Sequence, residues 1–411
     1  MGERWAKFGK GQLVGGSGAY TGPEPAVVAA VADLLPTFRQ RAQETEDNRV
    51  VSADSVKALA ETGFFRLLQP AAFGGIEADP LTFYTAVRLI ASACGSTGWV
   101  SSVIGVHPWH LGLFTPEAQQ EVWGTDTATR ISSSYAPTGK AVKVDGGHTV
   151  SGRWSFSSGC DHASWVFLGQ IVTDAENRPT DFRTFLLPRA DYVIEDVWDT
   201  VGLRGTGSND IVVSDVFVPE HRSLSFIDVS KLVVPGQELN HGPLYRLPYG
   251  SVFPYGITTP IIGMATGAYE AHVSYTRERV RVAYAGQKAA QDPHAQVRVA
   301  EAAAEIDGAW LALERNFTEL MGYARAGQEI PIDLRLRVRR DQVRGTGQSI
   351  RAVDKLFENS GGRALKTGTP IQRFWRDAHA GRVHAINDPE RSLSLYGGAE
   401  FGLPIPADAM L

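Results

Sequence analysis

Apolar residues recur three and four positions apart through the first quarter of the chain. This spacing predicts helices, of which the clearest cover residues 52–62 and 80–93. Gly63 follows the first of these and is suited to end it. We therefore expect a helical domain over residues 25–126. Before it, charges and glycines replace the apolar core of a signal peptide, which indicates a flexible tail over residues 1–24.

The period changes near residue 127, and as far as about residue 226 apolar and polar residues alternate. Alternation of this kind is typical of strands. Val142 and Val144 precede Asp145-Gly146-Gly147, which is a good hairpin turn. Four residues after the turn are expected on one face of the next strand: Val150, Gly152, Trp154 and Phe156. The pattern predicts a central β-barrel or β-sandwich domain over residues 127–235.

Helical spacing returns after Pro260. The widest apolar stripe consists of Ile306, Trp310, Leu313, Phe317, Leu320 and Met321. A further helix is expected to stop at Gly361-Gly362, and a last one to start at Thr369, a good cap followed by proline. These elements predict a C-terminal four-helix bundle over residues 236–411.

Helices, then strands, then helices give an α+β fold rather than the alternating order of a doubly wound sheet. No G-x-G-x-x-G segment opens a helix after a strand, so a built-in nicotinamide site is not expected.

Composition excludes several classes of partner. The chain has 40 basic and 45 acidic residues, a net charge of −5, and no long basic run. Nucleic acid is therefore not an expected partner. No segment approaches the roughly 20 apolar residues that span a bilayer. Cys94 and Cys160 are too few for a disulfide framework, which favours a reducing cytoplasm.

The middle of the chain contains two long motifs, GGHTVSGRWSFSSGCDHASW and VGLRGTGSNDIVVSDVFVPEHR. With the helix, sheet and helix order, they resemble the acyl-CoA dehydrogenase superfamily. Four stretches are similar to the oxygenase components of two-component flavin hydroxylases: ACGSTGWVSSVIGVHPWH, RISSSYAPTG, WSFSSGCDHASW and QRFWRDAHAGRVHAINDPE. The most similar subgroup acts on 3-hydroxy-9,10-secosteroids, and related oxygenases act on hydroxyphenylacetate, indoles, polyketides and amino sugars.

The resemblance implies a flavin between the sheet domain and the bundle, and a homotetramer. It implies that a separate NAD(P)H-dependent reductase supplies reduced flavin, FMNH2 or FADH2. With O2 as co-substrate, a flavin hydroperoxide would hydroxylate a bulky phenol ortho to its oxygen. Hydroxylation of an indole or polyketide is an alternative. Such a site has to be dry and rich in hydrogen bonds.

Two serine clusters beside aromatic residues suit that site, because hydroxyls form hydrogen bonds without adding charge. They are Ser132-Ser133-Ser134-Tyr135 and Phe156-Ser157-Ser158. By resemblance, Ser158 is the partner of flavin N5, and Trp99 packs nearby. The residues expected to line the flavin ring are Ser133, Ser134, Tyr135, Phe156 and Ser157. Serines at strand ends also commonly cap turns, and a tryptophan is commonly core, so each has a structural alternative.

Removal of the phenolic proton needs a base that is neutral near pH 7, and histidine is the usual choice. By resemblance, His384, near the end of the last helix, is that base, with Ala385 beside it at the flavin. His379, five residues earlier, is turned about 140° around a helix and cannot easily serve the same site. His107 is a second candidate, for a hydrogen bond to the phenol. The alternative is an ordinary core or surface histidine.

Three further assignments follow from the resemblance. Arg279 corresponds to an arginine that contacts the flavin phosphate of a neighbouring subunit, although a solvated helix face is the alternative. Gly362 and Arg363 correspond to backbone close to the flavin, although the glycines also suit a helix end. His107 and His110 could be read as a metal pair, but Pro108 should disturb the helix between them and no third ligand is well spaced, so no metal is expected.

Two rival functions remain. An acyl-CoA dehydrogenase needs a carboxylate base, commonly a glutamate in a Y-E-G-T-like stretch. This chain has Arg382-Val383-His384-Ala385 there and no acid before Asp388. A scaffold that lost its flavin is the other possibility, although Trp99, both serine clusters and His384 occur together.

Overall fold

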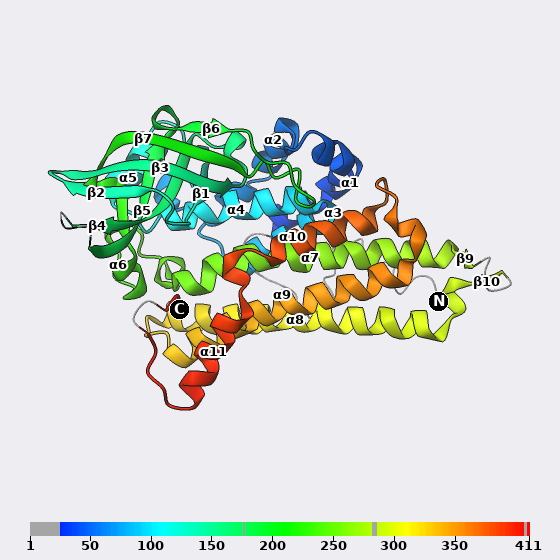
Figure 1. Cartoon of the computed structure of the whole chain (residues 1–411). Helices are drawn as coiled ribbons and strands as arrows, with labels where there is room; N and C mark the ends of the chain where they lie inside the picture. Colours follow the sequence, from blue (N-terminus) through cyan, green and yellow to red (C-terminus); the bar gives the residue numbers. More distant parts are fainter. Residues whose placement is uncertain (1–24, 175, 177, 282–285, 407–408) are drawn as a thin grey trace.

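The computed structural model describes residues 25–174, 176, 178–281, 286–406 and 409–411. The tail predicted over residues 1–24 lies outside the described residues. Helices, sheet and bundle follow one another along the chain as expected, and the β domain sits at one end of the long bundle (Figure 1). Within the described residues, no helix is both long and apolar enough to cross a bilayer.

The N-terminal region is helical, as predicted. Its helices are α1 (Pro25–Asp47), α2 (Ala53–Glu61), α3 (Pro80–Ala93), α4 (Gly95–Leu111) and α5 (Pro116–Trp123). Ser52 caps α2 by accepting a hydrogen bond from Ser55 N, and Gly63 follows with a left-handed φ of 84°. All residues of α4 are buried. Pro108 lies inside α4 without interrupting it, so the expected disturbance there was wrong.

The central domain is a mixed sheet. Its strands are β1 (Ile131–Ser134), β2 (Lys140–Val144), β3 (Gly147–Ser157), β4 (Trp165–Thr173), β5 (Pro179–Pro188), β6 (Val193–Glu195), β7 (Asn209–Pro219) and β8 (Ser223–Ser225). They pair in the order β6-β7-β3-β2-β4-β5-β8, and β1 runs parallel to β4. The sheet has its own small core around Trp154 and Phe185.

The predicted β2–β3 hairpin is present, with Val144 paired to Gly147. The shared strand face, however, was only partly right. Val150 and Trp154 are fully buried, but Phe156 is 66% exposed. The pairing of β3 with β7 shifts register between Trp154 and Ser157, and Phe156 has a left-handed φ of 70°. A bulge therefore turns the Phe156 ring out of the alternation.

The C-terminal four-helix bundle consists of α7 (Tyr249–Glu278), α8 (Pro293–Ala326), α9 (Ile332–Ser360) and α10 (Pro370–Arg382). The predicted apolar stripe of α8 is buried in it. Two details differ from expectation. Helical structure resumes earlier than Pro260, with α6 (Phe226–Ser230) and the start of α7. The last helix is α11 (Pro389–Glu400), which projects from the bundle (Figure 1). A short ladder, β9 (Val280–Arg281) with β10 (Gln287–Lys288), lies beyond α7.

The N-terminal helices and the bundle share one hydrophobic core. Both α3 and α4 pack on α7, which contains Pro254 and Pro260. Proline has no N–H, so Pro260 leaves the carbonyl of Gly256 without its helical partner. Ser102 of α4 donates its hydroxyl to that carbonyl at 2.5 Å. Helices α4 and α7 are thus held together by a buried hydrogen bond as well as by apolar packing.

Candidate active site

Trp99, Ser158 and Ser208 form a buried hydrogen-bonded chain where α4 meets the end of β3. Trp99 Nε1 donates to Ser158 Oγ at 3.1 Å, and Ser158 Oγ lies 2.7 Å from Ser208 Oγ. Ser158 is 6% exposed. The structure therefore brings together two predicted residues, Trp99 and Ser158, and adds Ser208.

His384 joins this group from the C-terminal side. Its ring centroid lies 6.1 Å from that of Trp99. It does not lie on a helix, as the sequence suggested, because α10 ends at Arg382 and His384 caps a short 3-10 turn at residues 385–387. Ala385, the first residue of that turn, is exposed. His379 instead bonds Asp354 at 2.8 Å.

Asn387 fixes the turn that carries His384. Its Oδ1 accepts hydrogen bonds from Thr258 of α7 at 3.2 Å and from Gln342 and Thr346 of α9 at 2.7 and 3.2 Å. Its Nδ2 donates to Gly381 O at 2.9 Å. Asn387 is fully buried and these partners lie on α7, α9 and α10, so three helices hold the turn that carries His384.

The hydrogen bonds of His384 define its neutral form. Nδ1 accepts from Ile386 N at 3.2 Å, so the ring carries its hydrogen on Nε2. Burial lowers the pKa of His384 to about 4, because the charged ring would lose water without gaining a partner. His384 is therefore uncharged at pH 7, as a proton acceptor has to be.

His107 presents the opposite pattern. Its Nδ1 donates to Ile131 O at 2.7 Å, which leaves a bare lone pair on Nε2. That Nε2 is buried and has no hydrogen-bond partner among the described residues. Burial lowers the pKa of His107 to about 4. A buried acceptor of this kind is costly unless a water or a ligand donates to it, so a hydrogen bond from His107 to a phenol stays a prediction.

The first serine cluster points in two directions. Ser134 Oγ donates to Ser155 O at 2.6 Å, and Ser132 Oγ accepts from Ser157 Oγ at 3.2 Å, so these side chains face β3. Tyr135 faces α4 instead, where its hydroxyl lies 2.8 Å from His110 Nδ1. Ser133 lies on the same side as Tyr135 because strand side chains alternate. The predicted lining residues thus occupy both faces of β1, rather than one wall.

Phe156 and its surroundings fit a flat ring system. The bulge exposes the Phe156 ring two residues before Ser158, and Trp198 supports it edge-on at a centroid distance of 6.0 Å. An exposed aromatic ring beside buried hydroxyls offers a stacking surface and hydrogen-bonding groups together. These residues could hold an isoalloxazine ring, with Ser158 at its polar edge.

Arg279, Gly362 and Arg363 lie elsewhere in the same chain, at the end of the bundle remote from the β domain (Figure 1). Arg279 ends α7 and donates to Ser360 O at 2.7 Å. Along α9, Ser360 is about 21 Å from Thr346, at 1.5 Å per residue. Thr346 bonds Asn387 in the turn that follows His384, so within one chain Arg279 lies far from that turn. Contact with a neighbouring subunit's flavin stays a prediction. Gly361 does end α9, with a φ of 67°.

Sequence reasoning missed the residues that support the site from a distance: Leu203, Thr206, Ser208, Asp377 and Asn387. All of them lie inside motifs that the sequence already marked, GLRGTGSND and RDAHAGRVHAIND. Their roles depend on partners far along the chain, such as the bond from Leu203 N to Asp377 Oδ1 at 2.7 Å. No local sequence pattern predicts a hydrogen bond between residues so far apart in the chain.

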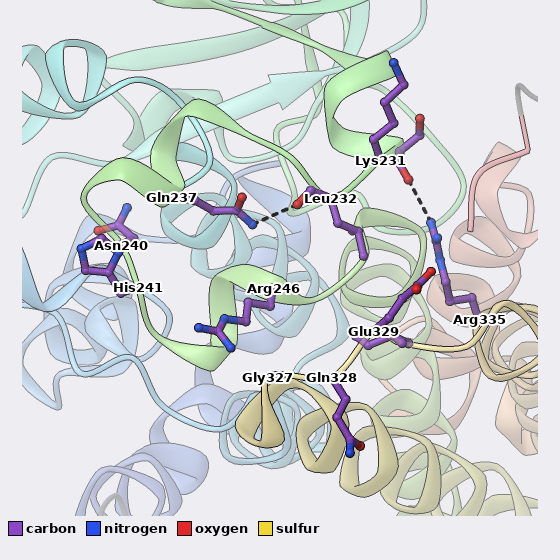
Figure 2. Close-up of a pocket in the computed structure, with 12 residues that line it drawn as sticks. Lys231, Leu232, Gln237, Asn240, His241, Arg246, Gly327, Gln328, Glu329 and Arg335 are labelled. Carbon is purple, nitrogen blue, oxygen red and sulfur yellow. Dashed lines mark hydrogen bonds between the residues drawn. The ribbon is translucent and has the colours of Figure 1, made fainter.

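A cavity of about 760 Å³ lies away from these residues, between the segments 230–246 and 327–335 (Figure 2). Lys231, Arg246 and Arg335 line it, together with Glu329. None of the predicted site residues lines it. It is therefore distinct from the candidate active site.

Metal-ligand side chains come together at one place in the described residues, formed by Glu117, Glu121 and His221. His221 Nε2 already lies 2.9 Å from Glu121 Oε1, and Arg222 bonds the same carboxylate. The cluster is a surface ion-pair network and does not include His107 or His110.

Two family descriptions match the chain. The acyl-CoA dehydrogenase N-terminal domain matches residues 26–130, and the acyl-CoA dehydrogenase C-terminal domain matches residues 255–389. They cover the helical domain and most of the bundle, on either side of the central sheet. Both matches agree with the fold expected from the sequence.

The flavin-dependent monooxygenase oxygenase subunit HsaA of Rhodococcus jostii is 62% identical over 372 residues, which are 90% of this chain and 97% of that protein. This chain belongs to the flavin-dependent monooxygenase oxygenase subunits. A crystal structure of 3-HSA hydroxylase from Rhodococcus sp. RHA1 superposes with a TM-score of 0.91 at 61% identity, covering 94% of this chain and 99% of that one. XiaF from Streptomyces sp., in complex with FADH2 and glycerol, is a more distant structural relative, with a TM-score of 0.85 at 27% identity over 92% of this chain and 96% of that one.

Membership of the oxygenase subunits confirms the resemblance that the motifs indicated. It also favours the hydroxylase interpretation over the dehydrogenase one, in agreement with a histidine rather than a carboxylate at position 384.

Proposed function

We propose that the chain is the oxygenase component of a two-component system that hydroxylates a bulky phenol ortho to its oxygen, with a 3-hydroxy-9,10-secosteroid as the favoured substrate. When bound, reduced flavin supplies two electrons to O2, so that one oxygen atom enters the ring and the other leaves as water. The protein's task is to hold the reactants, keep water out and handle the phenolic proton.

The observation that carries the proposal is the group formed by buried Trp99 and Ser158 with half-buried His384, close in the chain to the exposed Phe156 ring. Ser158 offers a hydroxyl already oriented by Trp99 and Ser208. His384 is neutral, because burial lowers its pKa to about 4. This arrangement suits a neutral, electron-rich ring bound next to a site for the phenol.

We assign the uptake of the phenolic proton to His384. This role has a structural condition, because neutral His384 carries its hydrogen on Nε2 and uses Nδ1 to accept from Ile386 N. Proton uptake therefore has to replace that 3.2 Å hydrogen bond. His107, with its bare Nε2, is the second group that can accept from a hydroxyl of the substrate.

The names of relatives support the remaining parts of the proposal. The Rhodococcus jostii relative is called an oxygenase subunit, which supports a separate NAD(P)H-dependent reductase for this chain. The structural relative named 3-HSA hydroxylase supports the secosteroid. XiaF holds FADH2, which supports FADH2 as the flavin here, with FMNH2 as the other choice. The two unpaired cysteines support a cytoplasmic location. A homotetramer would place Arg279 of one subunit near the flavin of another.

The test is a single-turnover reaction with purified protein and chemically reduced flavin. The protein is mixed without oxygen with FADH2 or FMNH2 and a phenol, then exposed to O2, and hydroxylated product and hydrogen peroxide are measured. Secosteroid phenols, indoles and simple phenols are compared. We expect a catechol product with a secosteroid phenol. Failure to bind reduced flavin, or complete conversion to hydrogen peroxide with every aromatic, would end the proposal.

Variants of His384 separate two roles for the ring. His384→Ala should retain flavin binding, while product formation falls by about 10²–10⁴-fold, the range for loss of a general base. His384→Gln keeps a donor close to the Nε2 position but cannot take a proton. An equal loss of product formation in both variants supports His384 as the base. Product formation retained in His384→Gln would show that the ring only donates a hydrogen bond. His379→Asn, which changes a histidine bound to Asp354 outside the site, is the matched control.

A further inference from the structure

The segment 201–208, called here the docking loop, connects the bundle to the candidate active site. Arg376 of α10 donates to Val201 O at 2.7 Å, and a Cβ on Gly202 would lie 2.2 Å from Arg376 O. The backbone of the docking loop is therefore pressed directly against α10. From Gly202 to Ser208, the loop is buried apart from the partly exposed Arg204.

Leu203 is the centre of this contact. It has a left-handed φ of 52°, which is unfavourable for a residue with a branched side chain. Its N–H donates to Asp377 Oδ1 at 2.7 Å, and its carbonyl accepts from Trp198 Nε1 and Thr206 Oγ1, both at 2.8 Å. A strained residue persists where its surroundings over-determine it, and Asp377 supplies one of these restraints.

The same loop contacts Ser158 through side chains and the next residue, Gly159, through the backbone. Thr206 Oγ1 lies 2.7 Å from Ser208 Oγ, which in turn lies 2.7 Å from Ser158 Oγ. Through the backbone, Thr206 O accepts from Gly159 N at 2.9 Å. An unbroken path of hydrogen bonds therefore runs from Asp377 through Leu203, Thr206 and Ser208 to Ser158.

Asp377 is itself held in place. It is 3% exposed, and Gly95, the first residue of α4, packs against it so closely that a Cβ there would lie 2.6 Å from Asp377 Oδ2. Burial raises the pKa of Asp377 to about 6, so the carboxylate is mainly charged at pH 7.5. Arg373, Arg376 and Glu46 are the charged groups around it.

We propose that Asp377 is a positioning residue, which fixes the docking loop on α10 so that Ser208 holds the Ser158 hydroxyl in one orientation. Asp377 is seven residues before His384 on the same segment. The Asp377 carboxylate thereby fixes the position of the Ser158 hydroxyl, in the sheet domain, relative to His384, in the bundle. The step from Ser158 to flavin rests on the proposed function, whereas the step from Asp377 to Ser158 does not.

The experiment begins with the protein free of flavin. Amide hydrogen exchange measures how well the backbone N–H groups of the docking loop are protected, and the indole N–H resonance of Trp99 reports its hydrogen bond to Ser158. In Asp377→Ala, loss of the acceptor should speed exchange at Leu203 by about tenfold or more and shift the Trp99 resonance. Asp377→Asn keeps an acceptor for Leu203 N and should largely restore both signals.

Two other variants address the ends of the path. Gly95→Ala should displace the Asp377 carboxylate and speed exchange at Leu203 without removing the acid, which keeps the inference testable if Asp377→Ala does not fold. Ser208→Ala should shift the Trp99 resonance but leave Leu203 protected. Asp354→Ala is the control, because Asp354 binds α10 through Trp375 and His379 on a different side.

The flavin-loaded protein gives the second measurement. Asp377→Ala and Ser208→Ala should each raise hydrogen peroxide relative to product, and the double variant should do no more than the stronger single one. Unchanged Leu203 exchange and Trp99 resonance in Asp377→Ala and Gly95→Ala would overturn the inference. Additive effects in the double variant would also overturn it. If wild-type protein does not bind flavin, the proposed function fails, but the flavin-free measurements still decide the role of Asp377.

Discussion

From the burial of His107 we predict a specific loss of folding stability at acid pH. Its folded-state pKa is about 4, below the reference value of about 6.5. Below pH 6.5 the unfolded chain takes up a proton at this residue that the folded protein does not. The stability contributed by neutral His107 is therefore complete above about pH 6.5 and is lost as the pH falls toward 4.

The size of the effect follows from that difference. By pH 4.5, binding of a proton to His107 in the unfolded chain should alone lower the free energy of unfolding by about 2.5 kcal/mol, at 1.36 kcal/mol for each pKa unit. With an unfolding entropy of about 2.1 cal/mol/K per residue over the whole chain, this corresponds to a drop in Tm of about 3 °C.

His107→Asn is the variant that isolates this contribution, because the asparagine Nδ2 can still donate to Ile131 O but does not titrate. Tm is measured at pH 7.5 and pH 4.5 for both proteins. His384, His148 and His272 also have pKa values of about 4, but they are present in both and cancel in the comparison. We expect the Tm of the variant to fall by about 3 °C less than that of wild type. Equal falls would refute the reasoning.

Two further predictions concern the placement of the site. Gly381→Ala should destabilise by about 1–3 kcal/mol, because the added Cβ would lie 2.8 Å from Trp99 Cζ3 and 3.1 Å from Ile261 Cγ1; a thermal melt with unchanged Tm would contradict it. Asn387→Ala should cost about 1–3 kcal/mol by leaving buried partners such as Gln342 unsatisfied. It should also speed amide exchange around His384, and normal protection there would show that Asn387 does not hold the turn.

Local patterns were sufficient for much of the fold. The helix α3 has the bounds that its periodicity predicted, and the β2–β3 turn lies at the predicted glycines. The exposed position of Phe156 could not be predicted, because it depends on a register shift against β7, more than fifty residues later in the chain.

The candidate site follows the same division. Trp99, Ser158 and His384 were marked by their motifs, and the structure brings them together. What holds them was not visible, since Leu203 and Asp377 are 174 residues apart and the Asn387 bonds join three helices. The turn at His384 exists because of those distant bonds, so periodicity alone extended the helix too far.

The hydrogen bond between Ser102 and the carbonyl that Pro260 frees has a consequence for recombining these oxygenases. A chimera that keeps the bundle of this chain but takes N-terminal helices without a hydroxyl at position 102 would retain Pro260 and lose the group that compensates for it. The buried carbonyl of Gly256 would then face an apolar side chain of α4. Transplants within this group should therefore carry α4 and α7 as a matched pair, even though about 140 residues of sheet and linker separate them.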